Sequence, residues 1–140
     1  MSRPTPQIRN LAQRLIAYER GDKLSEAKIR TFPAFEKLRP HLATLMGNAG
    51  FRALLSRSLA LANEEVPWLR AVHVKADGSL EALEQLETQV GPDEFMEGRV
   101  VLLAQLLGLL MAFIGENLTL RLVREVWPKL SLDDLDFGKG

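Results

Sequence analysis

The stretch from residue 99 to residue 115 constrains the fold more than any other part of the chain, because it is apolar on nearly every side. Gln105 is the one polar side chain between Arg99 and Gly115. On a helix turning about 100° per residue, the stretch has a bulky face and an opposite face of small residues. The bulky face consists of Leu103, Leu106, Leu107, Leu110, Phe113 and Ile114. The small-residue face consists of Ala104, Gly108, Ala112 and Gly115, together with Val101 and Gln105.

A helix that is apolar all round must be covered all round. We therefore expect this stretch to form the central helix of the domain, over about 93–115, either ending there or continuing to 127. A second chain is the alternative source of part of its cover. Asp93, Glu94 and Glu97 are typical of a helix start, because acidic groups interact favourably with the N-terminal end of the helix dipole.

The length and composition favour one globular domain. The chain has 140 residues, which is within the usual range for a single domain. Its 46% hydrophobic and 26% charged residues argue against an intrinsically disordered chain. The absence of cysteine excludes disulfides, thiolate metal sites and a cysteine nucleophile. We expect a cytoplasmic protein, because the N-terminal residues also lack the apolar run of a signal peptide.

Helical spacing of apolar residues recurs on both sides of the central stretch. Helices are predicted over 6–20, 24–30, 49–63 and 79–90, with another over 118–127 if the chain breaks at Gly115. Between 33 and 46 we expect two short helices or one bent helix, because Pro40 removes a backbone donor. Residues 68–74 are interpreted as a loop, since a single short strand there has no evident partner. The prediction is an all-α, single-domain bundle of five to six helices over 1–128.

No pattern in the sequence indicates an active site, a cofactor or a metal ion. The only histidines, His41 and His73, lie in separate segments without further ligands at suitable spacing. A glycine-rich phosphate loop and a nucleophile elbow are both absent from the sequence. The apolar run over 100–115 has 16 residues, fewer than the roughly 20 that a transmembrane helix needs. We expect neither an enzyme nor a transmembrane segment.

Three sets of residues are candidates for surface function. Small residues at helical spacing permit close helix contact, either with a second copy or with the 49–63 helix of the same chain. This helix-contact or self-association face is Ala104, Gln105, Gly108, Ala112 and Gly115. The tail over 129–140 alternates acidic and apolar residues and is expected to dock on a protein partner through Leu132, Asp133, Asp134, Leu135, Asp136 and Phe137. A basic face on the first helix consists of Arg9, Arg14 and Arg20.

The charge distribution gives the second functional hypothesis. Residues 1–75 carry 13 Lys/Arg against 6 Asp/Glu, whereas residues 76–140 carry 5 against 12. A basic half can contact nucleic acid, although aromatic residues for base stacking are sparse there and Phe32 and Phe35 are expected in the core. The prediction is a non-enzymatic helical module, an adaptor or regulator, that binds proteins including itself. The alternative is a nucleic-acid-associated regulator that acts through the basic N-terminal half.

Glu116, Asn117, Thr119 and Arg121 follow the most apolar helix and are a further candidate set. They either line a site at the end of the bundle or satisfy open backbone groups where a helix bends, and the second interpretation is preferred. Arg121 and Glu125 have the i,i+4 spacing of a helical ion pair.

Overall fold

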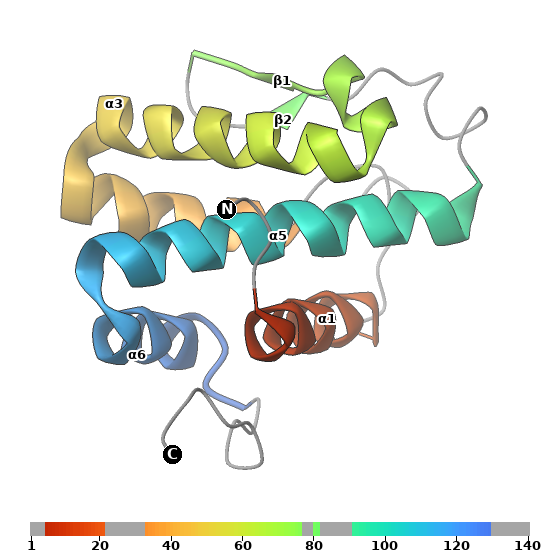
Figure 1. The fold of residues 1–140 in the computed structure, drawn as a ribbon. Helices are drawn as coiled ribbons and strands as arrows, with labels where there is room; N and C mark the ends of the chain where they lie inside the picture. The colour runs from red at the N-terminus through yellow and green to blue at the C-terminus, as the bar shows by residue number, and fades with distance from the viewer. Residues whose placement is uncertain (1–4, 22–32, 77–79, 82–90, 130–140) are drawn as a thin grey trace.

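The computed structural model describes residues 5–21, 33–76, 80–81 and 91–129. Within these residues it contains four α-helices, which confirms the all-α prediction (Figure 1). They are α1 (Pro6–Gly21), α3 (Pro33–Glu65), α5 (Pro92–Ile114) and α6 (Glu116–Val126). The expected count of five to six helices is not met in the described part of the chain. The helix predicted over 24–30 and the tail from residue 130 onward lie outside the described residues.

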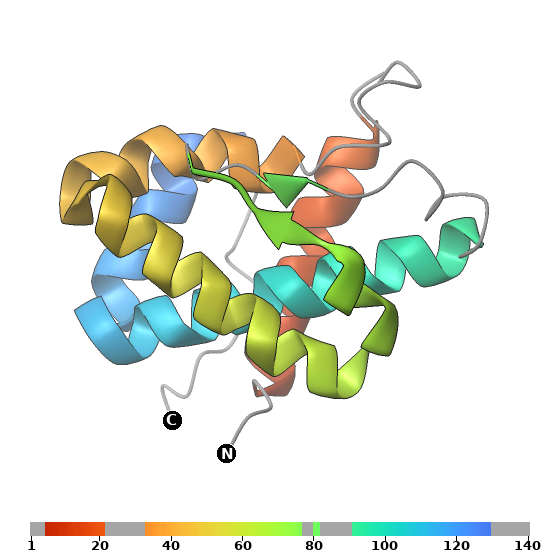
Figure 2. The same cartoon turned by 90° about the horizontal axis from the view of Figure 1, so that it is seen from above.

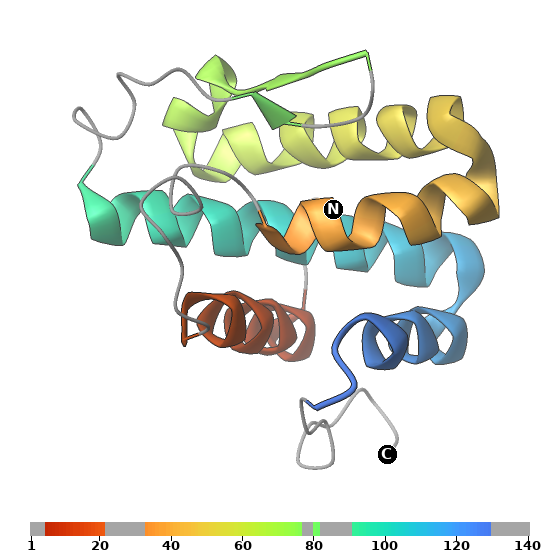
Figure 3. The same cartoon turned by 180° about the vertical axis from the view of Figure 1, so that it is seen from behind.

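Helix α5 is central, as predicted, and α1, α3 and α6 all pack against it. The second half of α3 lies on the side of α5 opposite to α1 and α6, and the first half of α3 lies beside α5, behind it in Figure 1 and in front of it in Figure 3. Residues 98–107 of α5 are buried without interruption. The all-round apolar pattern therefore correctly indicated a helix that is covered on every side over this part of its length.

Helix α1 begins as its sequence indicates. The Thr5 hydroxyl accepts a hydrogen bond from the backbone N–H of Ile8 at 3.3 Å, and Pro6 is the first helical residue. The buried stripe of α1 is Ile8, Leu11, Ala12, Leu15 and Ile16, and these residues have the apolar helical spacing from which the helix over 6–20 was predicted.

Two glycines with positive φ interrupt the helices. Gly47 (φ 81°, ψ 160°) separates the two halves of α3, and Gly115 (φ 93°, ψ 156°) separates α5 from α6. Only glycine adopts such angles without steric cost. The region 93–127 is thus two helices rather than one. The predicted kink at Pro40 is wrong: its ring is exposed, and Gly47 is where the backbone of α3 leaves the helical region.

The segment after α3 is more regular than expected. Pro67–Ala71 form a 3₁₀ helix, η1, and the strands β1 (His73–Val74) and β2 (Leu80–Glu81) pair antiparallel, Val74 with Leu80 (Figure 2). The loop prediction for 68–74 and the helix prediction starting after Ser79 are therefore wrong for these residues. The strand considered partnerless obtains its partner from residues that were assigned to the next helix. Residues 82–90 lie outside the described part.

An aromatic cluster fixes η1 on the N-terminal part of α5. The rings of Trp68 and Phe95 stack with centroids 5.2 Å apart and an interplanar angle of 18°. Gly98 makes room for the indole, because a Cβ at this position would overlap Cζ2 of Trp68 and lie 3.0 Å from Cε2 and Cη2. Arg99 is 3% exposed, and its guanidinium carbon lies 5.9 Å from the centroid of the Phe95 ring. The contact is within the range of a cation–π interaction.

The length of α5 changes the argument about a membrane. By length and composition alone, Asp93–Ile114 would suffice to cross a bilayer, and 56% of its most apolar window is buried inside the protein. The shorter apolar run of 16 residues within α5 therefore does not exclude a membrane span by length. Core helices of globular proteins pass the same test, and the cover provided by α1, α3 and α6 is what a core helix requires.

Candidate protein-binding surface

Large apolar side chains are exposed at one end of the bundle. Phe113 is 70% exposed, Leu45 is 48% exposed and Leu118 is 40% exposed. Each lies within three residues of one of the two helix breaks, Gly47 or Gly115. Figures 1 and 2 show that these two breaks lie at the same end of the molecule. We call the surface formed by Leu45, Phe113 and Leu118 the end surface.

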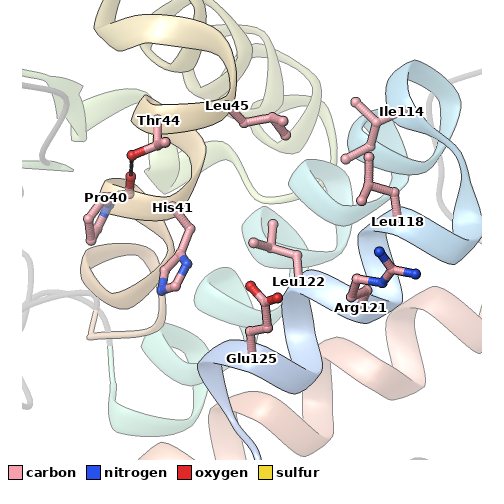
Figure 4. Close-up of a pocket in the computed structure, with 9 residues that line it drawn as sticks. All are labelled: Pro40, His41, Thr44, Leu45, Ile114, Leu118, Arg121, Leu122 and Glu125. Carbon is pink, nitrogen blue, oxygen red and sulfur yellow. Dashed lines mark hydrogen bonds between the residues drawn. The ribbon is translucent and has the colours of Figure 1, made fainter.

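A groove between the first half of α3 and α6 forms one side of the end surface. This α3–α6 groove has a volume of about 530 Å³ and is shown in Figure 4. Apolar side chains of Leu45, Ile114, Leu118 and Leu122 face it. Its polar lining is Pro40 backbone with His41, Thr44, Arg121 and Glu125 at the margins. The Thr44 hydroxyl donates to the Pro40 carbonyl at 3.0 Å, which leaves the groove mainly apolar.

A second groove lies between the other half of α3 and the C-terminal part of α5. This α3–α5 groove also has a volume of about 530 Å³. Its lining is apolar except for one charged side chain, Arg57, and consists of Met46, Gly50, Ala53, Leu54, Arg57, Leu109, Ala112 and Phe113. Small residues on both helices leave this space open. Leu45 and Met46 are neighbours, as are Phe113 and Ile114, so the two grooves adjoin at the end surface.

The chemistry of these grooves suits the binding of apolar side chains. Among the described residues, no group of three or more histidine or acidic side chains is arranged to hold a metal ion. His41 is exposed at the margin of the α3–α6 groove, and Figure 4 shows its ring and the Glu125 carboxylate on facing helices. Open, apolar grooves with charges at their edges are typical of surfaces that accept another polypeptide.

The structure divides the predicted helix-contact face into two parts. Ala104 is fully buried and Gln105 is 5% exposed, so this part of the face contacts helices of the same chain. Gly108 is half-buried, whereas Ala112 and Gly115 are exposed. Ala112 lines the α3–α5 groove. The five residues therefore do not form one surface for a second chain, because Ala104 and Gln105 are already covered within the protein.

Of the polar residues after α5, Thr119 contacts the helix break. The Thr119 hydroxyl, which is fully buried, donates to the Gly115 carbonyl at 2.8 Å, and Glu116 and Asn117 are exposed. Arg121 does line the α3–α6 groove. Among the described residues Arg121 and Glu125 form no ion pair, and Figure 4 shows their charged ends apart. Thr119 therefore lies at the helix break and Arg121 at the groove, and whether this set lines a functional site stays a prediction.

The basic face of α1 is partly engaged within the protein. Both terminal oxygens of the Glu65 carboxylate accept hydrogen bonds from Arg9 Nη2, at 2.8 and 2.7 Å, which joins α1 to the end of α3. Arg9 also borders a hollow of about 640 Å³ between α1 and α5, where Asp93 and Glu97 supply opposite charge. Arg14 has an interaction of its own. The side chain of Arg20 and the tail residues lie outside the described part.

The exposure of Phe113 and Leu118 was not predicted, because Phe113 belongs to the bulky face of a helix expected to be covered all round and Leu118 begins the helix expected over 118–127. The signal that identifies them is their position within three residues of Gly115, where the cover of an apolar helix ends. Comparison with known proteins adds no relative: no family model matches the chain, and no curated protein or solved structure matches it. The surface is therefore interpreted from its own geometry.

Proposed function

We propose that the protein is a non-enzymatic helical module that binds another polypeptide through the end surface. The observation that carries this proposal is the 70% exposure of Phe113 near the end of the apolar helix α5, whose residues 98–107 are buried. Exposing a phenylalanine to water has an unfavourable free energy of about 1.5–3 kcal/mol relative to burying it. A partner that covers Phe113 and the two adjoining grooves removes this apolar surface from water.

The arrangement also favours a rigid binding site. Phe113, Leu45 and Leu118 extend from three helical segments whose buried apolar residues are part of one core. Binding hot spots, the few residues that supply most of the binding free energy, are usually large anchor side chains that fill pockets at the centre of an interface. A bound partner therefore loses little affinity to ordering of this surface.

A photo-reactive amino acid at position 113 tests the proposal. We expect a specific covalent adduct with one polypeptide when the labelled protein is irradiated in its own cells. The matched control carries the same amino acid at Ala60, which is exposed on α3 and lines neither groove. The captured polypeptide, once identified and purified, should bind the wild-type protein and should bind Phe113→Asp at least tenfold more weakly.

Two results would contradict the proposal. One is an adduct pattern at position 113 that equals the pattern at position 60. The other is equal affinity of the purified polypeptide for the wild type and for Phe113→Asp, since a carboxylate at the centre of an apolar interface is strongly disfavoured.

A further inference from the structure

We propose that the polypeptide bound at the end surface is a second copy of this chain, with Phe113 of each copy inserted into the α3–α5 groove of the other. The inference rests on the proposed function and names its partner. A two-fold symmetric interface uses the same patch on both copies, so that patch must be self-complementary. The protein offers both halves of such a contact side by side: an exposed phenylalanine and an adjoining apolar groove.

The small residues of the groove provide the space for the inserted ring. Gly50 and Ala53 on α3 face Ala112 on α5 across the groove, where larger side chains would close it. Ala112 and Gly115 are the exposed members of the small-residue face. The predicted self-association is therefore retained, but at the last turn of α5 and not along its whole length.

The direction of the helices sets the geometry of the pair. The second half of α3 and α5 run in opposite directions (Figures 1 and 3). Met46 and Phe113 thus mark the end of the groove near the helix breaks, and Arg57 and Leu109 mark its inner end. A two-fold rotation about the middle of the groove exchanges these ends. Phe113 of one copy then meets Leu109 and Arg57 of the other.

The charges agree with the same rotation. Arg57 is the one charged residue that lines the groove, and Glu116 follows Phe113 by three residues beyond the opposite end. Both side chains are exposed, and within the described residues neither has an ion pair. The rotation brings Arg57 of each copy toward Glu116 of the other, which gives two equivalent ion pairs. Complementary charges of this kind fix the register of an interface.

The first experiment measures mass by light scattering and sedimentation of the full chain at concentrations from about 1 to several hundred μM. We expect a concentration-dependent rise toward twice the 15.7 kDa of one chain. Phe113→Ser should abolish the rise while circular dichroism shows a folded helical protein. A wild type that remains monomeric over the whole concentration range overturns the inference. The proposed function is tested independently of this result by the photo-crosslinking experiment at position 113.

The second experiment reverses the charges. Arg57→Glu and Glu116→Arg should each raise the dissociation constant about tenfold, because each variant places like charges together at both symmetric positions. The two variants mixed together should dimerise with nearly wild-type affinity, since every contact in the mixed dimer joins a Glu to an Arg. Arg52→Glu and Glu64→Arg are matched controls, because both residues are exposed on α3 and line neither groove.

The mixing result separates this interface from any other mode of dimerisation. Recovery on mixing the Arg57 and Glu116 variants, without an effect of the Arg52 and Glu64 variants, supports the inference. A dimer that tolerates both groove variants, or that is not restored by mixing them, overturns it.

Discussion

Substitution of Gly98 by alanine tests how α5 is fixed to η1. In an ordinary helix interior this change stabilises a protein by about 1 kcal/mol, because glycine is a poor helix former. Here we expect the opposite sign. A Cβ at position 98 overlaps Cζ2 of Trp68, and the two neighbouring ring atoms lie at 3.0 Å, whereas comfortable carbon contacts are about 3.5–4.0 Å. The indole is rigid and must move as a whole.

The expected loss in the free energy of unfolding depends on how far the Trp68 indole is displaced. Inserting a methyl group into a packed site costs about 1–3 kcal/mol, and this contact is severe enough to place the cost near the upper end. Displacing the indole also weakens its stacking on Phe95, an interaction of about 1 kcal/mol. After subtraction of the helix-propensity gain of about 1 kcal/mol, Gly98→Ala should lower the free energy of unfolding by about 2–3 kcal/mol. For a chain of this size the thermal midpoint then falls by roughly 6–12 °C.

Urea denaturation and thermal unfolding followed by circular dichroism measure this change. The decisive control is the same substitution in a Trp68→Leu background, where the overlapping ring atoms are gone. There Gly98→Ala should be stabilising by about 1 kcal/mol, so that the effect of one methyl group changes sign. A higher thermal midpoint for Gly98→Ala in the wild-type background would refute the packing of Trp68 on α5.

Three further predictions concern other parts of the structure. Phe113→Ser should change the free energy of unfolding by less than about 0.5 kcal/mol at concentrations where the chain is monomeric, because the ring is 70% exposed; a loss above 2 kcal/mol would show that it is buried. Gly115→Ala should destabilise by about 1–2 kcal/mol in thermal unfolding because φ is 93°, whereas Gly91→Ala, where φ is −60°, should be nearly neutral; equal effects would contradict the positive φ. A double-mutant cycle on Arg9→Ala and Glu65→Ala should give a coupling free energy of about 0.5–1 kcal/mol, since these side chains are 29% and 18% exposed. A coupling of zero would contradict the ion pair between Arg9 and Glu65.

Most of the helical architecture was predictable because each amphipathic helix carries its own periodicity. In α1 the buried residues Ile8, Leu11 and Leu15 recur at intervals of three and four, and a local pattern of that kind survives into the folded protein. Helix α5 was predictable for a different reason, because a helix that is apolar on all sides must be buried in a small globular domain. The sequence separated the helices near Gly47 but left open whether the chain breaks at Gly115, and at both positions the structure uses the backbone freedom of glycine.

The errors have a common physical cause, which is that burial depends on neighbours far away in the sequence. Leu118 continues the apolar stripe of α6, yet it is 40% exposed because the opposing helices do not extend over it. Val74 has too short a strand to predict, and its pairing depends on Leu80 being brought back beside it. Pro40 lies on the exposed side of α3, where its ring is accommodated without a break. Local patterns identify the apolar side of a segment, but they do not show how much of that side other segments of the chain cover.

The limited extent of the end surface also sets the strength of the proposed pairing. A fully buried phenylalanine contributes about 150–250 Å², so Phe113 and the groove around Gly50, Ala53 and Ala112 supply only several hundred Å² per copy. Interfaces below about 1,200 Å² in total are typical of weak, transient complexes. We therefore expect a dissociation constant in the micromolar range, measured by sedimentation equilibrium. A nanomolar constant would mean that the pairing surface extends well beyond the last turn of α5, because a patch of this size does not provide enough apolar contact.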